Sequence, residues 1–219
     1  MEIINTLFGL AFVLAPIIGA IALAIALSDK TSLSKGEYCE KIVSRNLHRL
    51  DPNLYTTIDN VILPSNGNTS HTQIDHIVVS QFGVFCLETK SHKGWIFGSS
   101  DQKYWTQVLY RDKYRLYNPL WQNFAHTKAL ELLLGLNLRV PIVPIVVFPN
   151  ADKIKVSGSR VVGNIEETLQ VITQRKTKIY SPDQYDMIIR SINIANKNDQ
   201  DTVDSHTMEV RALIGTTRS

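Results

Sequence analysis

Two strand-like runs, residues 72–80 and 83–89, are separated by only two residues, and this short connection constrains the fold more than any other feature of the sequence. Both runs are rich in residues that favour strands, so they should pair as an antiparallel β-hairpin. Hydrophobic residues make up 44% of the chain and charged residues 20%, which is typical of a globular protein. We therefore expect the hairpin to belong to the sheet of a folded domain.

The length of the hairpin loop decides where two acidic side chains point. With a two-residue loop, Ser80 pairs with Gly83, and the same register places Asp75 directly across from Glu88. A three-residue loop that ends in Gly83 would place the two carboxylates on opposite faces instead. Gly83 suits both loops. We adopt the two-residue register because it brings the two carboxylates together, which makes chemical sense.

The rest of the chain contains further strand-like and helical segments. Strands are expected over residues 55–63, 95–98, 104–110 and 140–148, and helices over residues 34–50, 119–134, 165–173 and from Pro182 onward. This order predicts an α/β fold, with a mixed sheet flanked by helices, in a domain over residues 34–195. Residues 196–219 are polar and are expected to form a mobile C-terminal tail.

The N-terminal segment has the length of a membrane span. No residue from Ile3 to Leu27 is charged, and about 20 apolar residues suffice to cross a bilayer. Residues 24–26 resemble a signal-peptide cleavage site, which leaves a cleaved signal as the alternative. The long apolar run, preceded by no basic residue, favours a transmembrane helix over residues 1–28, with a linker at 29–33. Basic residues follow it and indicate a cytoplasmic C-terminal domain: Lys30, Lys35, Lys41 and Arg45.

Three acidic residues stand where a soluble fold usually places apolar side chains. Glu40 is at helical spacing from apolar residues of its helix, and Asp75 and Glu88 have the strand parity of inward-facing rows. Converging carboxylates are costly unless a cation neutralises them, and Mg²⁺ prefers carboxylate oxygens. Lys90, beside Glu88, could stabilise charge on a phosphate. Alternatively, Lys90 neutralises the acids in a structural ion-pair cluster without metal.

Several histidines lie near the same hairpin. A zinc site formed by His71, His76 and His92 with Asp75 is conceivable. However, His76 has the opposite strand parity to Asp75 and should point away from it, which favours a packed or solvated histidine. For His126, the sequence leaves core packing and the rim of the site equally open.

Short motifs around these residues resemble a known family. The spacing from Asp75 to Glu88-Thr89-Lys90 resembles the core of PD-(D/E)xK nucleases, although no proline precedes Asp75. With their surroundings, the motifs resemble the nuclease-related domain, NERD, most strongly over residues 34–134, and Cys39 stands where a glycine is expected. The motifs that carry this resemblance are Gly36-Glu37-Tyr38-Cys39-Glu40, Gln73-Ile74-Asp75-His76, Phe82-Gly83-Val84-Phe85, Glu88-Thr89-Lys90, Lys93-Gly94-Trp95-Ile96-Phe97-Gly98, Trp105-Thr106-Gln107 and Asn118-Pro119-Leu120-Trp121-Gln122.

The resemblance implies a restriction-endonuclease-like core that hydrolyses, or once hydrolysed, nucleic-acid phosphodiesters with Mg²⁺ or Mn²⁺. It implies that Asp75 and Glu88 are metal ligands and that Lys90 is the catalytic lysine. Glu40 would be a helix-borne ligand that acts through water. Gln122 occupies a position where related nucleases often hold a helix glutamine near the metal.

A basic run and several aromatic residues could contact nucleic acid. Arg111, Lys113 and Arg115 alternate with tyrosines and are candidates for contacts with phosphates. A solvated hairpin tip is the alternative for this run. Tryptophan and phenylalanine side chains could stack on bases, but large aromatic residues belong more often to the core; the candidates are Trp95, Phe97, Trp105 and Trp121.

The leading hypothesis is a membrane-anchored, Mg²⁺-dependent nuclease that acts on DNA. The first alternative is a catalytically inactive, membrane-tethered module that binds nucleic acid or protein, and the second is a scaffold domain. The net charge of +3 permits a nucleic-acid partner without demanding one. The chain contains neither G-x-x-x-x-G-K-[ST] nor G-x-S-x-G, which argues against NTPases and serine hydrolases, and no nucleotide cofactor is expected.

Overall fold

The computed structural model describes residues 34–65, 69–135, 141–158, 162–197 and 200–216. The chain divides into two compact units, residues 1–35 and 36–219, and the second contains nearly all of the described residues. The expected transmembrane helix at 1–28 and the linker at 29–33 lie outside the described residues. Within the described part of the chain, no helix combines the length and apolar character needed to cross a membrane.

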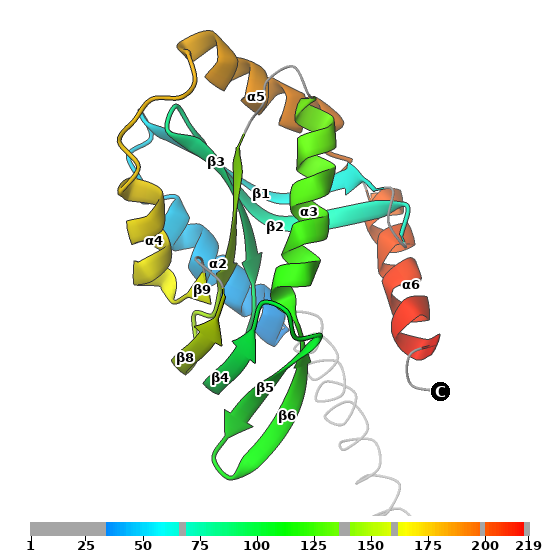
Figure 1. Cartoon of the computed structure of the whole chain (residues 1–219). Coiled ribbons are helices and arrows are strands. Elements are labelled where there is room, and N and C mark those ends of the chain that lie inside the picture. The colour runs from blue at the N-terminus through cyan, green and yellow to red at the C-terminus, as the bar shows by residue number, and fades with distance from the viewer. Residues whose placement is uncertain (1–33, 66–68, 136–140, 159–161, 198–199, 217–219) are drawn as a thin grey trace, which may run out of the picture. The chain divides into compact units, whose positions relative to one another are not determined.

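The larger of two sheets contains the predicted hairpin. Its strand order is β1-β2-β3-β7-β9, with bounds Tyr55–Pro64, His71–Ser80, Gly83–Thr89, Ile142–Val147 and Val162–Gly163 (Figure 1). The first three strands are antiparallel, and β7 and β9 join in parallel, so the sheet is mixed. Ser80 pairs with Gly83, which confirms the two-residue loop.

The second sheet has the strand order β6-β5-β4-β8, with bounds Asp112–Tyr117, Tyr104–Leu109, Gly94–Ser99 and Ala151–Ser157. Strands β4, β5 and β6 are antiparallel, and β8 pairs in parallel with β4. The sequence did not predict β6, β8 or β9. In β6 only Leu116 is buried, so this strand lacks the apolar alternation by which a half-buried strand is recognised.

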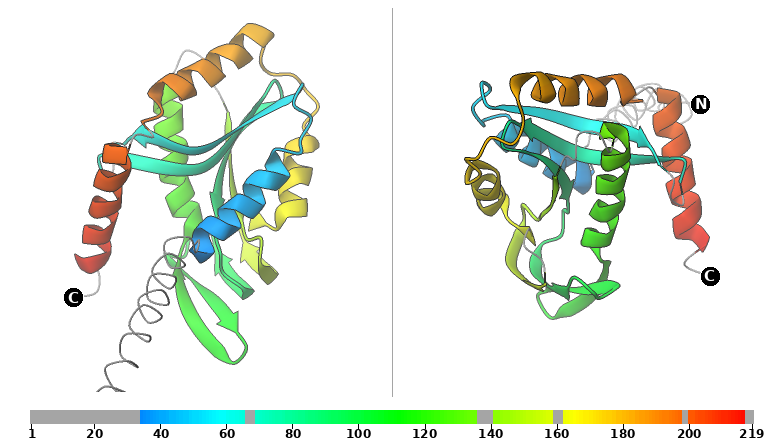
Figure 2. Two further views of the ribbon diagram at one scale, coloured as in Figure 1. Left: turned by 180° about the vertical axis from the view of Figure 1, so that it is seen from behind. Right: turned by 45° about the horizontal axis from the view of Figure 1, so that its top comes forward.

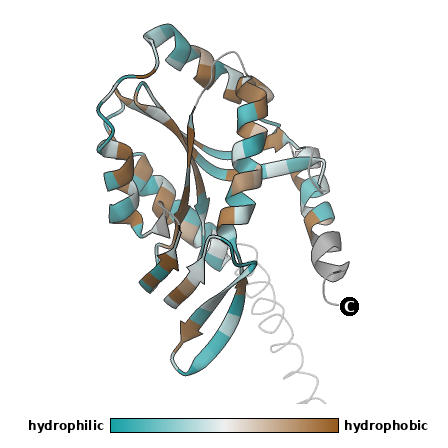
Figure 3. Cartoon of the chain, viewed as in Figure 1, coloured by the Kyte–Doolittle hydropathy of each residue, from teal (hydrophilic) through white to brown (hydrophobic). Residues whose placement is uncertain are grey.

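Helices cover both faces of the larger sheet. On one face, α3 (Pro119–Leu134) and α5 (Pro182–Ala195) pack against residues such as Ile77 and Cys86. On the other face, α2 (Lys35–Leu47) and α4 (Ile165–Thr173) pack against residues such as Val78 and Phe85 (Figure 2). Figure 3 shows that apolar residues are concentrated in the central strands of this sheet and that the helices are of mixed polarity. The expected α/β fold, a mixed sheet flanked by helices, is confirmed.

Local sequence signals set the ends of α3. The Asn118 side chain accepts a hydrogen bond from the Leu120 amide, Pro119 is the first helical residue, and the helix ends at Gly135. Asparagine satisfies a free amide at a helix start, and proline fits the first turn because it has no amide hydrogen to lose. The prediction for this helix is confirmed at both ends.

The segment after Asn196 differs from the expectation of a mobile tail. Residues Gln200–Thr216 form a helix, α6, and the Glu209 carboxylate accepts hydrogen bonds from the Ser70 amide (3.0 Å) and the Ser70 hydroxyl (2.8 Å). Val203 and Val210 are seven residues apart and so share one side of the helix. Most residues of α6 are polar, which is why the sequence did not lead us to expect a helix here.

Candidate active site

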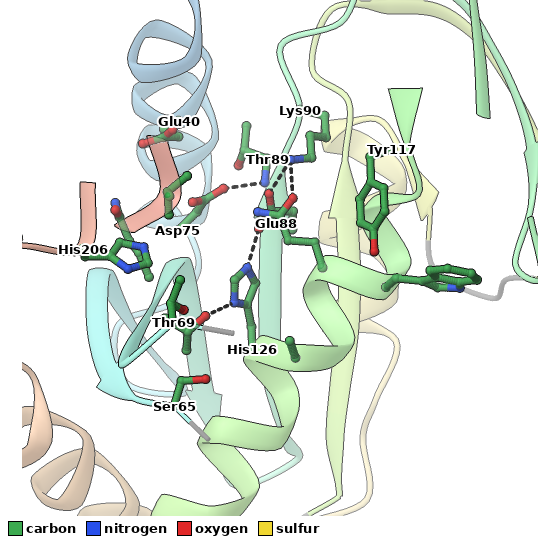
Figure 4. Close-up of a pocket in the computed structure, with 16 residues that line it drawn as sticks. Glu40, Ser65, Thr69, Asp75, Glu88, Thr89, Lys90, Tyr117, His126 and His206 are labelled. Carbon is green, nitrogen blue, oxygen red and sulfur yellow. Dashed lines mark hydrogen bonds and ion pairs between the residues drawn. The ribbon is translucent and has the colours of Figure 1, made fainter. Parts of the chain in front are cut away.

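Elements of both faces of the larger sheet meet at a cavity of about 700 Å³ (Figure 4). Glu40 reaches it from α2, Asp75 from β2, and Gln122 from α3, together with Glu88 and Lys90 from the end of β3. All five residues that the sequence nominated for catalysis or metal binding therefore line one cavity. Others that line it are Thr72, Tyr117, Trp121, His126, His206 and Val210.

The two hairpin acids come together because of the strand register. The pairing of β2 with β3 runs from Ser80 and Gly83 to His76 and Leu87, so the next position on each strand holds Asp75 and Glu88. The Thr89 amide donates a hydrogen bond of 2.7 Å to Asp75 Oδ2. The Asp75 carboxylate thus binds a backbone amide of β3 just beyond the last paired residues of β2 and β3.

Glu88 is almost fully buried, with 3% of its surface exposed, and two groups compensate its charge. Lys90 Nζ lies 2.7 Å from Glu88 Oε1, and His126 Nε2 lies 3.0 Å from Glu88 Oε2. Burial by itself would raise the pKa of this carboxyl. The Lys90 charge and the hydrogen bond with His126 outweigh burial and lower the pKa of Glu88 below its usual value.

In Asp75 and Glu40, by contrast, the effects that raise the pKa outweigh those that lower it. Burial, followed by the charges of Glu88 and Glu40, raises the pKa of Asp75 well above its usual value. Burial also raises the pKa of Glu40, to which Glu88 adds and against which His76 acts. Burial and the neighbouring carboxylates therefore both disfavour ionisation of Asp75 and Glu40.

Helix α3 supplies two side chains one turn apart. Gln122 Oε1 accepts a hydrogen bond of 2.8 Å from Lys90 Nζ, so the ammonium group bridges Gln122 and Glu88. His126 Nδ1 lies 2.6 Å from the Thr72 hydroxyl. An ionised Glu88 can only accept, so His126 Nε2 carries the hydrogen of that contact, and a neutral ring accepts from Thr72.

The structure resolves the position of His126, which the sequence left open. It lies four residues after Gln122 and therefore on the same side of α3. That spacing was the only signal in the sequence that His126 could lie beside Glu88. The packing of α3 against β3, which brings the two residues together, is a feature of the tertiary structure.

The donor set fits a divalent cation chemically. Three carboxylates face one cavity, and a cation would offset both the burial and the mutual repulsion that raise the pKa of Asp75 and Glu40. Among residues that the structure describes, no three acidic, histidine or cysteine side chains lie close enough to form a complete metal-binding group. Both Glu88 oxygens already have partners, so metal binding there requires Glu88 to exchange at least one of these contacts.

The three histidines considered for a zinc site do not gather around Asp75. His76 points away from it, as its strand parity predicted, and its Nδ1 lies 2.7 Å from Asp59 Oδ1. His71 Nδ1 contacts the Ser70 hydroxyl at 2.9 Å. His92 packs edge-on against the Phe148 ring, 6.4 Å between centroids. The interpretation of these histidines as zinc ligands is therefore not supported.

The basic run lies on the hairpin of β5 and β6. Arg111 occupies its turn, and Lys113 and Arg115 belong to β6. None of these three residues lines the cavity of about 700 Å³. Their contact with phosphates remains a prediction.

The aromatic candidates divide between core and surface. Trp105 is 1% exposed and stacks near Phe148, so it belongs to the core. The ring centres of Trp95 and Phe97, two residues apart on β4, lie 6.1 Å from each other, but Trp95 remains 46% exposed. Trp121 is 40% exposed at the cavity.

Comparison with known proteins shows which family the chain belongs to. A family model described as "Nuclease-related domain" matches residues 35–149, just over half of the chain. An uncharacterized protein of Bacillus anthracis is 46% identical over 101 residues, which cover 46% of this chain and 47% of that relative. The chain thus matches about half the length of this curated relative. No solved structure matches the chain.

Proposed function

Because the chain belongs to the nuclease-related domain family, we propose that it is a membrane-anchored nuclease that hydrolyses phosphodiester bonds of DNA with Mg²⁺ or Mn²⁺. The observation that carries the proposal is the convergence of Glu40, Asp75, Glu88 and Lys90 on one cavity. Carboxylates that crowd around a cavity disfavour their own ionisation, and a divalent cation is the partner that offsets this cost.

In this proposal Asp75 and Glu88 would hold the cation, and Glu40 would be a further ligand that acts through water. A bound divalent cation supplies positive charge that offsets the charge of the phosphate and favours deprotonation of the attacking water. The Thr89 amide orients Asp75 before substrate binds, whereas Glu88 would exchange its contact with Lys90 or His126 to hold the cation.

Lys90 acts on the substrate. Its ammonium group is held between Glu88 and Gln122, with 19% of the side chain exposed at the cavity. From this position it can donate to a phosphate oxygen and stabilise the charge that develops there during attack. Gln122 restricts the directions in which the ammonium group can point, which makes Gln122 a positioning residue.

A cleavage assay tests the proposal. Full-length protein in detergent micelles is incubated with linear and branched DNA, with Mg²⁺ or with EDTA. We expect cleavage only with the metal, and a loss of at least a hundredfold in Asp75→Asn and Lys90→Ala. Lys128→Ala is the matched control, since this lysine is exposed and pairs with Glu131 on the same helix as Gln122. Cleavage that persists in both cavity variants contradicts the assigned roles.

One observation favours a second candidate, a non-catalytic module that binds nucleic acid. Lys90 and His126 contact both oxygens of the buried Glu88 carboxylate, so protein groups alone can compensate its charge. Titration calorimetry distinguishes the two candidates. DNA binding by a protein that shows no heat of Mg²⁺ or Mn²⁺ binding would favour the module.

The membrane anchor is a separate part of the proposal and rests on residues 3–27. Fractionation of cells that express the chain tests it: the protein should stay with membranes after washing at alkaline pH, and replacing residues 3–27 by a polar segment should release it. Protease added to sealed vesicles of known orientation tests the cytoplasmic location of the C-terminal domain.

A further inference from the structure

The second sheet carries aromatic and basic side chains together on one face. In the parallel pairing of β4 with β8, Trp95 lies beside Lys153, and Phe97 lies beside Lys155. Lys153 Nζ is 5.1 Å from the centre of the Trp95 ring, and Lys155 Nζ is 5.8 Å from that of Phe97. Both lysines are exposed.

The same face continues across β5 and β6. Phe97 pairs with Thr106, which in turn pairs with Arg115, so the side chains of Phe97 and Arg115 lie on one side of the sheet. The Arg115 guanidinium lies 4.0 Å from the centre of the Tyr104 ring. We call these six residues the aromatic–basic face: Trp95, Phe97, Tyr104, Arg115, Lys153 and Lys155.

The opposite side of this sheet explains why the aromatic–basic face points outward. Ile96, Trp105 and Leu116 alternate with its residues and pack into a core with Val146 and Phe148. Because successive side chains of a strand point to opposite faces, the neighbours of these buried residues must face away from the core. The aromatic rings on the outer side are therefore not explained by core packing.

A chain of aromatic rings connects this face to the cavity. The Tyr104 and Tyr117 rings lie 6.0 Å apart, and the Tyr117 and Trp121 rings 6.2 Å apart. Tyr117 and Trp121 both line the cavity that holds Asp75 and Glu88. The exposed face and the proposed catalytic cavity are thus continuous.

We propose that the aromatic–basic face binds a single-stranded segment of nucleic acid and leads it to the cavity. This inference rests on the proposed function and specifies the form of its substrate. Bases of a single strand are free to stack on aromatic rings, and nearby lysines and arginines attract the phosphates. In a duplex the bases are already stacked on one another, so a flat aromatic surface gains little from them.

The main competing occupant is an anionic membrane surface, because tryptophan and lysine also favour the interface of a bilayer. Two features favour nucleic acid. The aromatic residues belong to a sheet rather than to an amphipathic helix, and their row continues into a cavity of about 700 Å³, which a single strand can enter and a bilayer surface cannot. Vesicle binding is therefore included in the test.

Fluorescence anisotropy of full-length protein in detergent micelles measures the binding. The probes are a labelled oligothymidylate and a blunt duplex of the same length, in EDTA so that hydrolysis does not interfere. We expect tighter binding of the single strand than of the duplex. Lys153→Gln/Lys155→Gln and Trp95→Ala should each weaken single-strand binding about tenfold. Removing two phosphate contacts should also reduce the slope of log affinity against log salt by about 1.4.

Two further variants test whether the effects depend on the position of the lysines and on the aromatic ring of Trp95. Lys176→Gln/Lys178→Gln removes an exposed lysine pair of the same spacing between α4 and α5 and should leave binding unchanged. Trp95→Phe keeps an aromatic ring and should retain most of the affinity that Trp95→Ala loses. Thermal unfolding confirms that each variant is folded.

Each outcome separates this inference from the proposed function. Face variants that bind the single strand as well as the lysine control does, or a wild type that binds the duplex equally well, overturn the inference even if DNA is cleaved. Face variants that lose binding to phosphatidylserine vesicles but keep single-strand binding also overturn the inference. A protein that cleaves nothing, yet loses single-strand binding in the face variants, contradicts only the proposed hydrolysis.

Discussion

Lys90 Nζ lies 2.7 Å from Glu88 Oε1, although the two residues are separated by only one residue at the end of β3. Side chains two positions apart in a strand point to the same side, so the pair follows from local geometry. Gln122 then holds the same ammonium group from another element. Lys90 therefore compensates the charge of a buried acid and also faces the cavity.

Asp75→Asn should abolish metal-dependent activity without destabilising the metal-free protein. Asparagine keeps an oxygen that can accept from the Thr89 amide, and it removes one of the charges that repel one another at the cavity. We expect an unchanged or raised melting temperature in EDTA, and no further rise on addition of Mg²⁺, which stabilises the wild type by binding only its folded state. A melting temperature in EDTA several degrees lower than that of the wild type would contradict this account.

Lys90→Met should destabilise the protein by about 3 kcal/mol, because it leaves the Glu88 charge buried with His126 as its remaining compensating group. Glu88→Gln in the same chain should restore much of this loss. Urea unfolding of the two single variants and the double variant gives the coupling energy.

The matched control for that cycle is Lys128→Met. The side chains of Lys128 and its partner Glu131 are 53% and 39% exposed, so the change should destabilise the protein by less than about 1 kcal/mol. If both lysine variants lower the free energy of unfolding by the same amount, the Lys90–Glu88 pair stabilises the fold no more than a surface pair does.

Gln122→Ala should lower the rate of cleavage about tenfold to a hundredfold while changing the free energy of unfolding little. The substitution removes one of the two groups that orient Lys90, as loss of an outer-shell partner does at other sites. Single-turnover kinetics measure this effect. The loss should appear in the rate constant rather than in DNA affinity, since Gln122 itself is not proposed to bind DNA.

Asp59 should make the stability of the fold depend on pH in the acid range. Burial would raise its pKa, but hydrogen bonds from His76, Ser44 and His48 outweigh burial and lower the pKa from 3.8 to about 2. A lowered pKa stabilises the folded state above the unfolded value of the pKa. This contribution, about 2 kcal/mol, should be lost as pH falls from about 4 to about 2.

Urea unfolding as a function of pH checks this prediction. Asp59→Asn should be less stable than the wild type at neutral pH and should lose less stability over the acid range. Asp186→Asn, a change at an exposed aspartate of α5, serves as control and should follow the wild-type profile. Parallel profiles for the wild type and Asp59→Asn would show that the network around Asp59 does not stabilise the fold.

Elements with strong local signals were predicted well. The caps Asn118 and Gly135 placed α3, and a two-residue loop fixed the register that sets Asp75 across from Glu88. By contrast, β6 and α6 were missed, because their side chains are mostly polar and their packing partners lie elsewhere in the chain. Periodicity reveals an element only where one side of it is apolar.

The local parts of the candidate site follow from the order of residues along the chain: which residues share a strand face, where α3 begins, and that Lys90 follows Glu88 on the same side. Two other features depend on packing between elements: Glu40 reaches the cavity from the opposite face of the sheet, and His126 rather than another histidine contacts Glu88. The difference lies in the range of the interactions. Backbone geometry fixes neighbours within a few residues, whereas the packing of helices across a sheet depends on the burial of the whole core.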